Sequence, residues 1–219
     1  MNQLQYERLA NDLRELAIDI PLHWGEVQND QADGKLNMFA IETFAELKAA
    51  ISKMTENDKD YWKRRWYIWR CSQCDEYLFY CNDNVEPNPN KKDKSWDVKI
   101  DDKYVFDIKG TVIPKNMRNN AESVISNPMK MVEFFYEKQS TGVRYDIQNR
   151  LFIVHHSFVD EDREFYLRCA WESKQKIYRE FIERIDDLSF INTHSVKAGV
   201  IFILERTKGM VEYKICGLS

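Results

Sequence analysis

Long apolar runs are absent from this sequence, and so is the pattern of an exported protein. No segment approaches the roughly 18–20 consecutive apolar residues that span a bilayer, so we expect no transmembrane helix and no membrane partner. The opening residues MNQLQYERLANDLREL are polar and lack the apolar region of a signal peptide, which predicts a cytoplasmic location. The chain also has no internal repeat and no low-complexity tract.

Cysteine is scarce and occurs in an odd number. The five cysteines are thinly spread, which is typical of reduced thiols in a cytoplasm. Cys71 and Cys74 have the spacing of a zinc or redox pair, but a structural zinc ion needs four ligands. Cys81 could add a third ligand, and no histidine lies nearby. We therefore expect thiols here rather than a zinc site.

The sequence also lacks an excess of basic charge. Its formal net charge is −4, which does not favour a nucleic-acid partner, although a basic face can coexist with an acidic back. Residues 1–60 hold six Lys and Arg against twelve Asp and Glu, whereas residues 109–150 hold seven against four. The charge is therefore polarised along the chain, and the basic segment keeps a nucleic-acid partner open.

The residues that are present indicate a globular protein. The chain has 219 residues, of which 43% are hydrophobic, 31% charged and 13% aromatic. This length and composition suit one domain, spanning residues 1–219, with a bulky core. Within it we distinguish an N-terminal helical part (1–54), a central core (55–158) and a C-terminal helix and hairpin (159–219).

Hydrophobic periodicity and turn residues predict the order of elements. Helices are expected at 3–18, at 38–54, from Thr55 onward, at 128–139 and at 170–188. Loops are expected at 25–37 and, because Asn and Pro are frequent there, at 82–95. Strands are expected in a hairpin at 96–110, at 150–158, and in a terminal hairpin at 198–217. This order predicts a mixed α/β domain whose central β-sheet is flanked by α-helices.

The segment WDVKIDDKYVFDIKG, residues 96–110, carries the most informative pattern. It reads as two strands around a three-residue turn at 101–103. This turn would pair Ile100 with Tyr104 and place Asp97 opposite Asp107. Because side chains alternate along a strand, the apolar residues of both strands share one face. The other face carries Asp97, Lys99, Val105, Asp107 and Lys109.

Two opposed carboxylates on one face destabilise a hairpin by roughly a few tenths of a kcal/mol or more. Lys99 and Lys109 could offset this as neighbours, and the acids would then be ordinary solvated ion pairs. A divalent cation would offset it better, because Mg²⁺ takes oxygen ligands and keeps several waters beside one or two carboxylates. Acid-x-Lys is itself common in the chain, at Asp33, Glu46, Asp97, Asp101, Glu172 and Glu212. Asp107 differs by its apolar strand, its opposed acid and the basic segment that follows.

At these residues the sequence resembles the PD-(D/E)xK nuclease superfamily, whose members share the restriction-endonuclease-like fold. The match is Trp96-Asp97, then nine residues, then Asp107-Ile108-Lys109. Trp96 stands where proline is usual. The helix at 128–139 and the strand at 150–158 fill the positions that follow in such families. The resemblance covers roughly residues 55–158, which would be the catalytic core.

By position, the resemblance implies that Asp97, Asp107 and Lys109 are catalytic. Asp97, Asp107 and the backbone carbonyl of Ile108 would bind Mg²⁺, for which Mn²⁺ can substitute, and Lys109 would orient the attacking water. Families of this type often add a metal ligand from an upstream helix. The candidates here are Glu42, Glu46 and Glu76, and the sequence does not choose among them.

Basic and amide residues downstream of the site would contact DNA phosphates and base edges. The candidates are Lys115, Arg118, Lys130, Gln139, Arg144 and Arg150. Each one taken singly is better explained as a solvated surface residue, so the expectation rests on their clustering after the site.

The resemblance implies a Mg²⁺-dependent endodeoxyribonuclease that cuts double-stranded DNA, in the manner of a type II restriction enzyme. A homodimer is expected, because a protein that cuts both strands of a palindrome should share the two-fold symmetry of its site. Two other classes stay open. One is a catalytically inactive nucleic-acid-binding relative, and the other is a protein-interaction domain whose acids form surface ion pairs.

Overall fold

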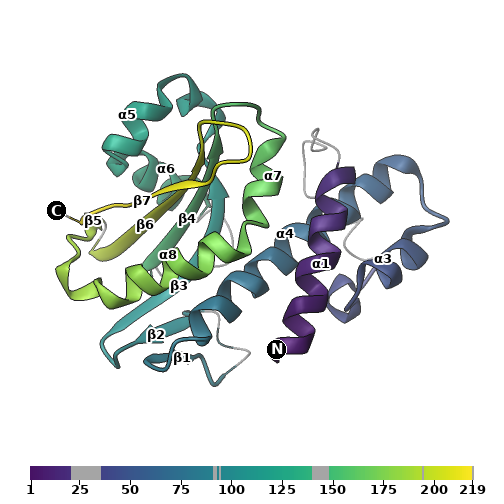
Figure 1. Cartoon of the computed structure of the whole chain (residues 1–219), viewed down its shortest axis with the longest axis horizontal. Coiled ribbons are helices and arrows are strands. Elements are labelled where there is room, and N and C mark those ends of the chain that lie inside the picture. Colours follow the sequence, from purple (N-terminus) through teal and green to yellow (C-terminus); the bar gives the residue numbers. More distant parts are fainter. Residues whose placement is uncertain (21–35, 91–92, 94, 140–147, 194, 219) are drawn as a thin grey trace. The chain divides into compact units, whose positions relative to one another are not determined.

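The computed structural model describes residues 1–20, 36–90, 93, 95–139, 148–193 and 195–218. The chain divides into two compact units, Met1–Cys74 and Asp75–Ser219, and each is described by itself. The first unit consists of helices, and the second contains the sheet (Figure 1). No helix among the described residues is long and apolar enough to cross a membrane.

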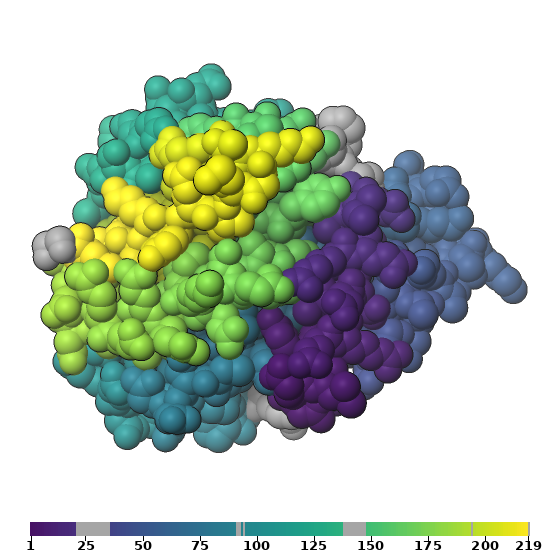
Figure 2. All heavy atoms as spheres, in the orientation of Figure 1, coloured from purple at the N-terminus to yellow at the C-terminus, as the bar shows by residue number. Residues whose placement is uncertain are grey.

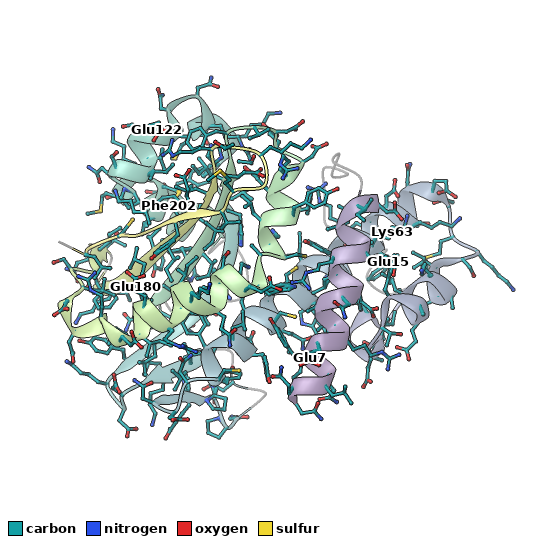
Figure 3. The ribbon with its side chains drawn as sticks, in the orientation of Figure 1. Glu7, Glu15, Lys63, Glu122, Glu180 and Phe202 are labelled. Atoms are coloured by element: carbon teal, nitrogen blue, oxygen red, sulfur yellow. The ribbon has the colours of Figure 1, made fainter. Side chains whose placement is uncertain are left out.

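The described residues of the first unit form α-helices and a 3₁₀ turn. They are α1 (Gln3–Asp19), η1 (Met38–Ala40), α3 (Phe44–Ile51) and the first part of α4 (Glu56–Tyr80). Trp66 on α4 is fully buried and its indole N–H donates to the carbonyl of Ile41 at 2.9 Å. Glu7 and Glu15 on α1 are exposed (Figure 3). The predicted helices at 3–18 and after Thr55 are confirmed.

The helix predicted over 38–54 is wrong at its beginning. Thr43 and Glu46 form a capping box, in which the Thr43 hydroxyl accepts from the Glu46 N–H at 3.2 Å and the Glu46 carboxylate accepts from the Thr43 N–H at 3.1 Å. This cap starts α3 at Phe44. The residues before it continue the apolar spacing but form the separate turn η1.

The second unit is a mixed sheet of seven strands, in the order β1-β2-β3-β4-β6-β5 with β7 also paired to β6. The strands are β1 (Val85–Pro87), β2 (Val98–Ile100), β3 (Tyr104–Val112), β4 (Arg150–Ser157), β5 (Ile191–Thr193), β6 (Val196–Glu205) and β7 (Glu212–Ile215). β3, β4 and β6 are parallel neighbours, and the other pairs are antiparallel. β4 is buried along its whole length, as its apolar run predicts.

Helices cover both faces of this sheet. Between β3 and β4 come η2 (Lys115–Asn120), α5 (Ala121–Ser126) and α6 (Met129–Gln139), and after β4 come α7 (Arg163–Arg168), α8 (Trp171–Glu183) and η3 (Ile185–Asp187). α5 and α6 pack on the face that carries Phe152 and Phe202. α8 packs on the opposite face, where the rings of Phe181 and Phe106 are 6.4 Å apart. Atoms of α8 and of the terminal hairpin fill the front of this unit in Figure 2. The predicted mixed α/β class is therefore confirmed.

Short elements account for the errors of the sequence analysis in this unit. The loop predicted at 82–95 is wrong at Val85–Pro87, which pairs with β2 as strand β1. Proline is tolerated there because an edge strand leaves one set of N–H positions unpaired. α5, α7 and β5 were not predicted, and α8 ends at Glu183 instead of 188. The loop predicted at 25–37 lies almost wholly outside the described residues.

Candidate active site

The β2–β3 hairpin has the predicted register for the pairs within its strands, but Asp97 precedes β2 and the predicted pairing of Asp97 with Asp107 is not among them. Val98 pairs with Phe106 and Ile100 with Tyr104. Asp101 and Asp102 adopt positive φ angles of 53° and 56°, and the N–H of residue 103 donates to the carbonyl of residue 100 at 3.0 Å. Aspartate tolerates this left-handed conformation, and such turns match the twist of paired strands. The turn therefore sets the register in which β2 pairs with β3.

Asp97 and Asp107 are brought together beside this hairpin. The Asp97 N–H donates to the carbonyl of Phe106 at 2.8 Å, and its Oδ2 accepts from the N–H of Ile108 at 2.7 Å. Asp107 is only 2% exposed. Burial and the neighbouring Asp107 charge raise the pKa of Asp97, whereas the hydrogen bond from Ile108 opposes that rise. The like-charge conflict inferred from the sequence is thus present in the folded protein.

Two cations flank the Asp107 carboxylate. Lys109 Nζ lies 2.6 Å from Oδ1, and Arg150 Nε lies 3.5 Å from Oδ2. Arg150 opens β4 directly beside Asp107 in the parallel register. Its guanidinium stacks over the ring of Tyr136, with 4.9 Å between the guanidinium carbon and the ring centroid. Arg150 was expected among surface DNA contacts, and the structure has it buried at the acid instead.

Glu76 is the candidate upstream acid that joins this group. Partial burial and then the charge of Asp97 raise its pKa to about 8, with Asp75 and Asp107 acting in the same sense and Lys109 opposing them. We call Glu76, Asp97 and Asp107 the acidic cluster. Lys109 is its cation.

The other two upstream candidates lie in the first unit. Hydrogen bonds from the backbone N–H groups of Glu42 and Thr43 lower the pKa of Glu46, because its carboxylate closes the capping box of α3. Glu42 lies just before that box, and its own backbone N–H donates to the Glu46 carboxylate at 2.8 Å.

Tyr80 completes the surroundings of Glu76 and was missed by the sequence analysis. Its hydroxyl donates to the backbone carbonyl of Asp97 at 3.2 Å. Burial and the charges of Glu76 and Asp97 raise the pKa of Tyr80. Glu76 and Tyr80 are four residues apart on α4, a spacing that puts two side chains on the same helix face. The same spacing relates Glu42 to Glu46, so it does not by itself single out Glu76.

The donor atoms of the acidic cluster suit Mg²⁺ chemically. Mg²⁺ binds oxygen and needs only one or two protein carboxylates, since waters complete its shell. Asp97 and Asp107, with the carbonyl of Ile108, could supply such a site. In the part of the chain that the structure describes, no group of three or more His, Cys, Asp or Glu side chains has the geometry to hold a metal ion. The fit is therefore to a two-carboxylate site.

The residues predicted to contact DNA differ in their exposure and in their protein partners. Lys115 and Lys130 are exposed on η2 and α6. Arg118 is held by Glu164, to which it donates two hydrogen bonds of 2.8 and 2.7 Å. Gln139 ends α6, but its side chain and the whole of Arg144 lie outside the described part of the protein.

Comparisons of the chain with protein-family models, with curated proteins and with solved structures found no match. Interpretation of the site therefore depends on its residues and their geometry.

Proposed function

We propose that this protein is a Mg²⁺-dependent endodeoxyribonuclease with a restriction-endonuclease-like fold, which hydrolyses phosphodiester bonds of double-stranded DNA. One observation carries the proposal: two acids and a lysine lie at the β2–β3 hairpin next to Arg150 of β4, and an acid from helix α4 is near enough for the charge of Asp97 to raise its pKa. Acids whose pKa values are raised by burial and by neighbouring acids, as those of Glu76 and Asp97 are, are typical of functional positions.

Each residue has a stated role in this proposal. Asp97, Asp107 and the carbonyl of Ile108 bind the cation. Bound there, Mg²⁺ would polarise the scissile phosphate and activate a water molecule. Lys109 is 30% exposed at its side chain, so its ammonium can reach both Asp107 and a water in front of it.

Glu76 and Arg150 support these residues. Glu76 has a pKa of about 8, so in the metal-free protein it is protonated near neutral pH and a cation would compete with that proton. Arg150 keeps a positive charge beside Asp107. Arginine suits this place because a guanidinium stays charged when buried and stacks on aromatic rings.

The biological setting follows from the chemistry. We propose cleavage of both strands at a palindromic site, in cytoplasmic restriction-modification or another form of DNA defence. Two copies of the chain would then bind the two half-sites, because a two-fold site matches a two-fold dimer.

Cleavage of supercoiled plasmid tests the proposal. We expect Mg²⁺-dependent nicking or linearisation by the wild type, and a loss of at least about 100-fold in Asp107→Asn, because the charge that holds the cation is removed. Asp102→Asn is the matched control, since it changes an exposed acid in the same hairpin to a residue that also tolerates positive φ. The proposal fails if the wild type leaves varied DNA intact with Mg²⁺ and Mn²⁺, or if Asp107→Asn cuts as fast as the wild type.

A second candidate is a catalytically inactive DNA-binding relative. It is favoured by the ammonium of Lys109 on Asp107 Oδ1 and by the Ile108 N–H on Asp97 Oδ2, because these bonds stabilise the acids without a metal. DNA affinity measured against salt separates it from a protein-interaction domain. A DNA binder should lose affinity steeply as salt rises, whereas an interaction domain should show little affinity at any salt.

A further inference from the structure

A second polar group lies within the sheet unit, and the roles above do not use it. Asp75 is 1% exposed, and its Oδ1 accepts from Lys174 Nζ and from the Tyr178 hydroxyl, each at 2.8 Å. Lys174 has no exposed surface and also donates to the carbonyl of Arg168 at 2.9 Å. We call Asp75, Lys174 and Tyr178 the buried polar cluster. It joins α4 to α8, and through Arg168 to the end of α7.

Stability alone explains this cluster poorly. Removing a lysine and an aspartate from water costs several kcal/mol per ion, and apolar residues of similar volume often stabilise a protein equally well or better. What a buried ion pair adds is geometry, because its bonds form in one arrangement of the helices only. The cluster is therefore expected to specify how the last residues of α4, from Asp75 to Tyr80, pack against α8.

The buried polar cluster adjoins the acidic cluster at two places, one on helix α4 and one on strand β3. Asp75 directly precedes Glu76 on α4. Gly110 directly follows Lys109 on β3, and a Cβ at Gly110 would come within 3.1 Å of Arg168 Nη1 and 3.9 Å of Asp75 Oδ2. Because side chains alternate along a strand, Gly110 faces away from the side of β3 that carries Asp107. The buried polar cluster thus contacts the same helix and the same strand as the acidic cluster, from the other face.

Because Asp75 and Glu76 are neighbours on one helix, fixing the position of Asp75 also fixes the position of Glu76. Successive residues of an α-helix are about 100° apart around its axis and about 1.5 Å along it. When Asp75 is held against α8, the direction of the Glu76 side chain around the helix axis and its position along that axis are both fixed. A functional site tolerates displacements of only about 0.5 Å, so a helix free to slip by one residue could not keep Glu76 in place.

We propose that Asp75 is a positioning residue, which acts through Lys174 and Tyr178 to hold Glu76 at the acidic cluster. The inference rests on the proposed function, since it assigns Glu76 to the metal-dependent site. It makes a specific claim, namely that the buried polar cluster governs cation affinity more than it governs folding.

The decisive variant replaces the whole cluster by apolar groups, as Asp75→Leu, Lys174→Met and Tyr178→Phe together. We expect it to fold with a melting temperature within about 5 °C of the wild type, because both members of the Asp75–Lys174 ion pair are removed together. The Mg²⁺ concentration for half-maximal cleavage should rise about 10- to 100-fold, because a displaced Glu76 no longer supports the two carboxylates, Asp97 and Asp107, that bind the cation. Mn²⁺ affinity without DNA, measured by electron paramagnetic resonance, should fall by the same factor.

The matched control removes a different buried ion pair, as Arg163→Met with Glu205→Gln. Arg163 Nη2 and Glu205 Oε1 form this pair at 2.5 Å. Glu205 pairs with Ser157 at the last residue of β4, whereas Asp107 lies beside Arg150 at the first. Because a strand rises about 3.3 Å per residue, the length of β4 separates this ion pair from Asp107. This variant should keep the wild-type Mg²⁺ dependence even if its melting temperature falls.

Each outcome decides the proposal. An unchanged Mg²⁺ dependence in the folded triple variant overturns the positioning role while the nuclease proposal stands. If the triple variant does not fold, Tyr178→Phe decides, since it removes one bond to Asp75 and keeps the ion pair. It should raise the half-maximal Mg²⁺ concentration about two- to fivefold, and no rise overturns the role. A wild type that cuts no DNA and binds no Mn²⁺ overturns both proposals at once.

Discussion

At the scale of single residues, the protonation of Glu76 is the property most open to measurement. The folded protein holds the Glu76 proton up to about pH 8, whereas an ordinary glutamate loses it near 4.5. Between these values the folded state binds more protons than the unfolded chain. Stability must therefore fall as pH rises through this window. The raised pKa of Asp97 acts in the same direction.

Glu76→Gln should remove much of this dependence. In buffers with a chelator, we expect the variant to gain free energy of unfolding relative to the wild type as pH rises from about 4.5 to about 8. Urea unfolding at several pH values measures this. Glu122→Gln is the control, and its effect on stability should have the opposite sign. The hydrogen bond from Arg206 lowers the pKa of Glu122, so the ionised carboxylate stabilises the fold and the variant should lose stability at neutral pH. Parallel curves for wild type and Glu76→Gln would contradict the raised pKa.

Two of the basic residues after the site, Arg118 and Lys130, should differ in how much their removal changes stability. Arg118→Ala leaves the buried carboxylate of Glu164 without its bidentate partner, so it should lower the free energy of unfolding by about 2–3 kcal/mol. Lys130→Ala removes an exposed charge and should leave stability unchanged. If Lys130 contacts a phosphate, the slope of log affinity against log salt falls by about 1 in that variant. Equal stability of the two variants would contradict the assignment of Arg118.

The sequence identified Asp97, Asp107 and Lys109 because all three depend on local spacing. Two strands and a short turn determine which side chains face each other. Glu76 could only be offered beside Glu42 and Glu46, because choosing it requires the docking of a distant helix. Arg150 was assigned to the surface for the same reason. Its burial depends on β4 lying parallel to β3, which the residues around it do not encode.

At the scale of elements, local capping explains the start of α3. Thr43→Ala removes one half of the capping box and should lower the free energy of unfolding by about 1 kcal/mol. Ser52→Ala is the control, because Ser52 is exposed at the other end of the helix and bonds only to the carbonyl of Ala49. Chemical denaturation followed by circular dichroism measures both. A cost below a few tenths of a kcal/mol for Thr43→Ala would contradict the cap.

Long periodic elements were predictable and short ones were not. The helices α1 and α6, the strand β4 and the two hairpins carry enough alternating or periodic residues to define their type. β1, β5, α5 and α7 are each too short for a period to repeat. β1 and β5 form because a neighbouring strand supplies their hydrogen-bond partners, and α5 and α7 form because their buried apolar residues pack in the sheet unit, so the stability of all four is tertiary in origin.

At the scale of the whole molecule, the proposed cleavage of both strands requires two copies of the 26.2 kDa chain on one site. Analytical ultracentrifugation with duplex DNA and Ca²⁺, which is chosen to permit binding without cleavage, should show a complex with two chains per duplex. A complex with one chain that still yields double-strand breaks would contradict the dimer. It would leave the nuclease proposal itself intact.

The ends of the sheet restrict how such a dimer could form. β1 at one end has three residues and closes on Pro87, and β5 and β7 at the other end have three and four. Strands this short offer few open backbone groups to a second molecule. Pairing of two copies through their edge strands into one continuous sheet is therefore disfavoured, and so is aggregation through those strands. Self-recognition would have to use side chains on helices and loops, where a few substitutions can abolish pairing without disturbing the sheet.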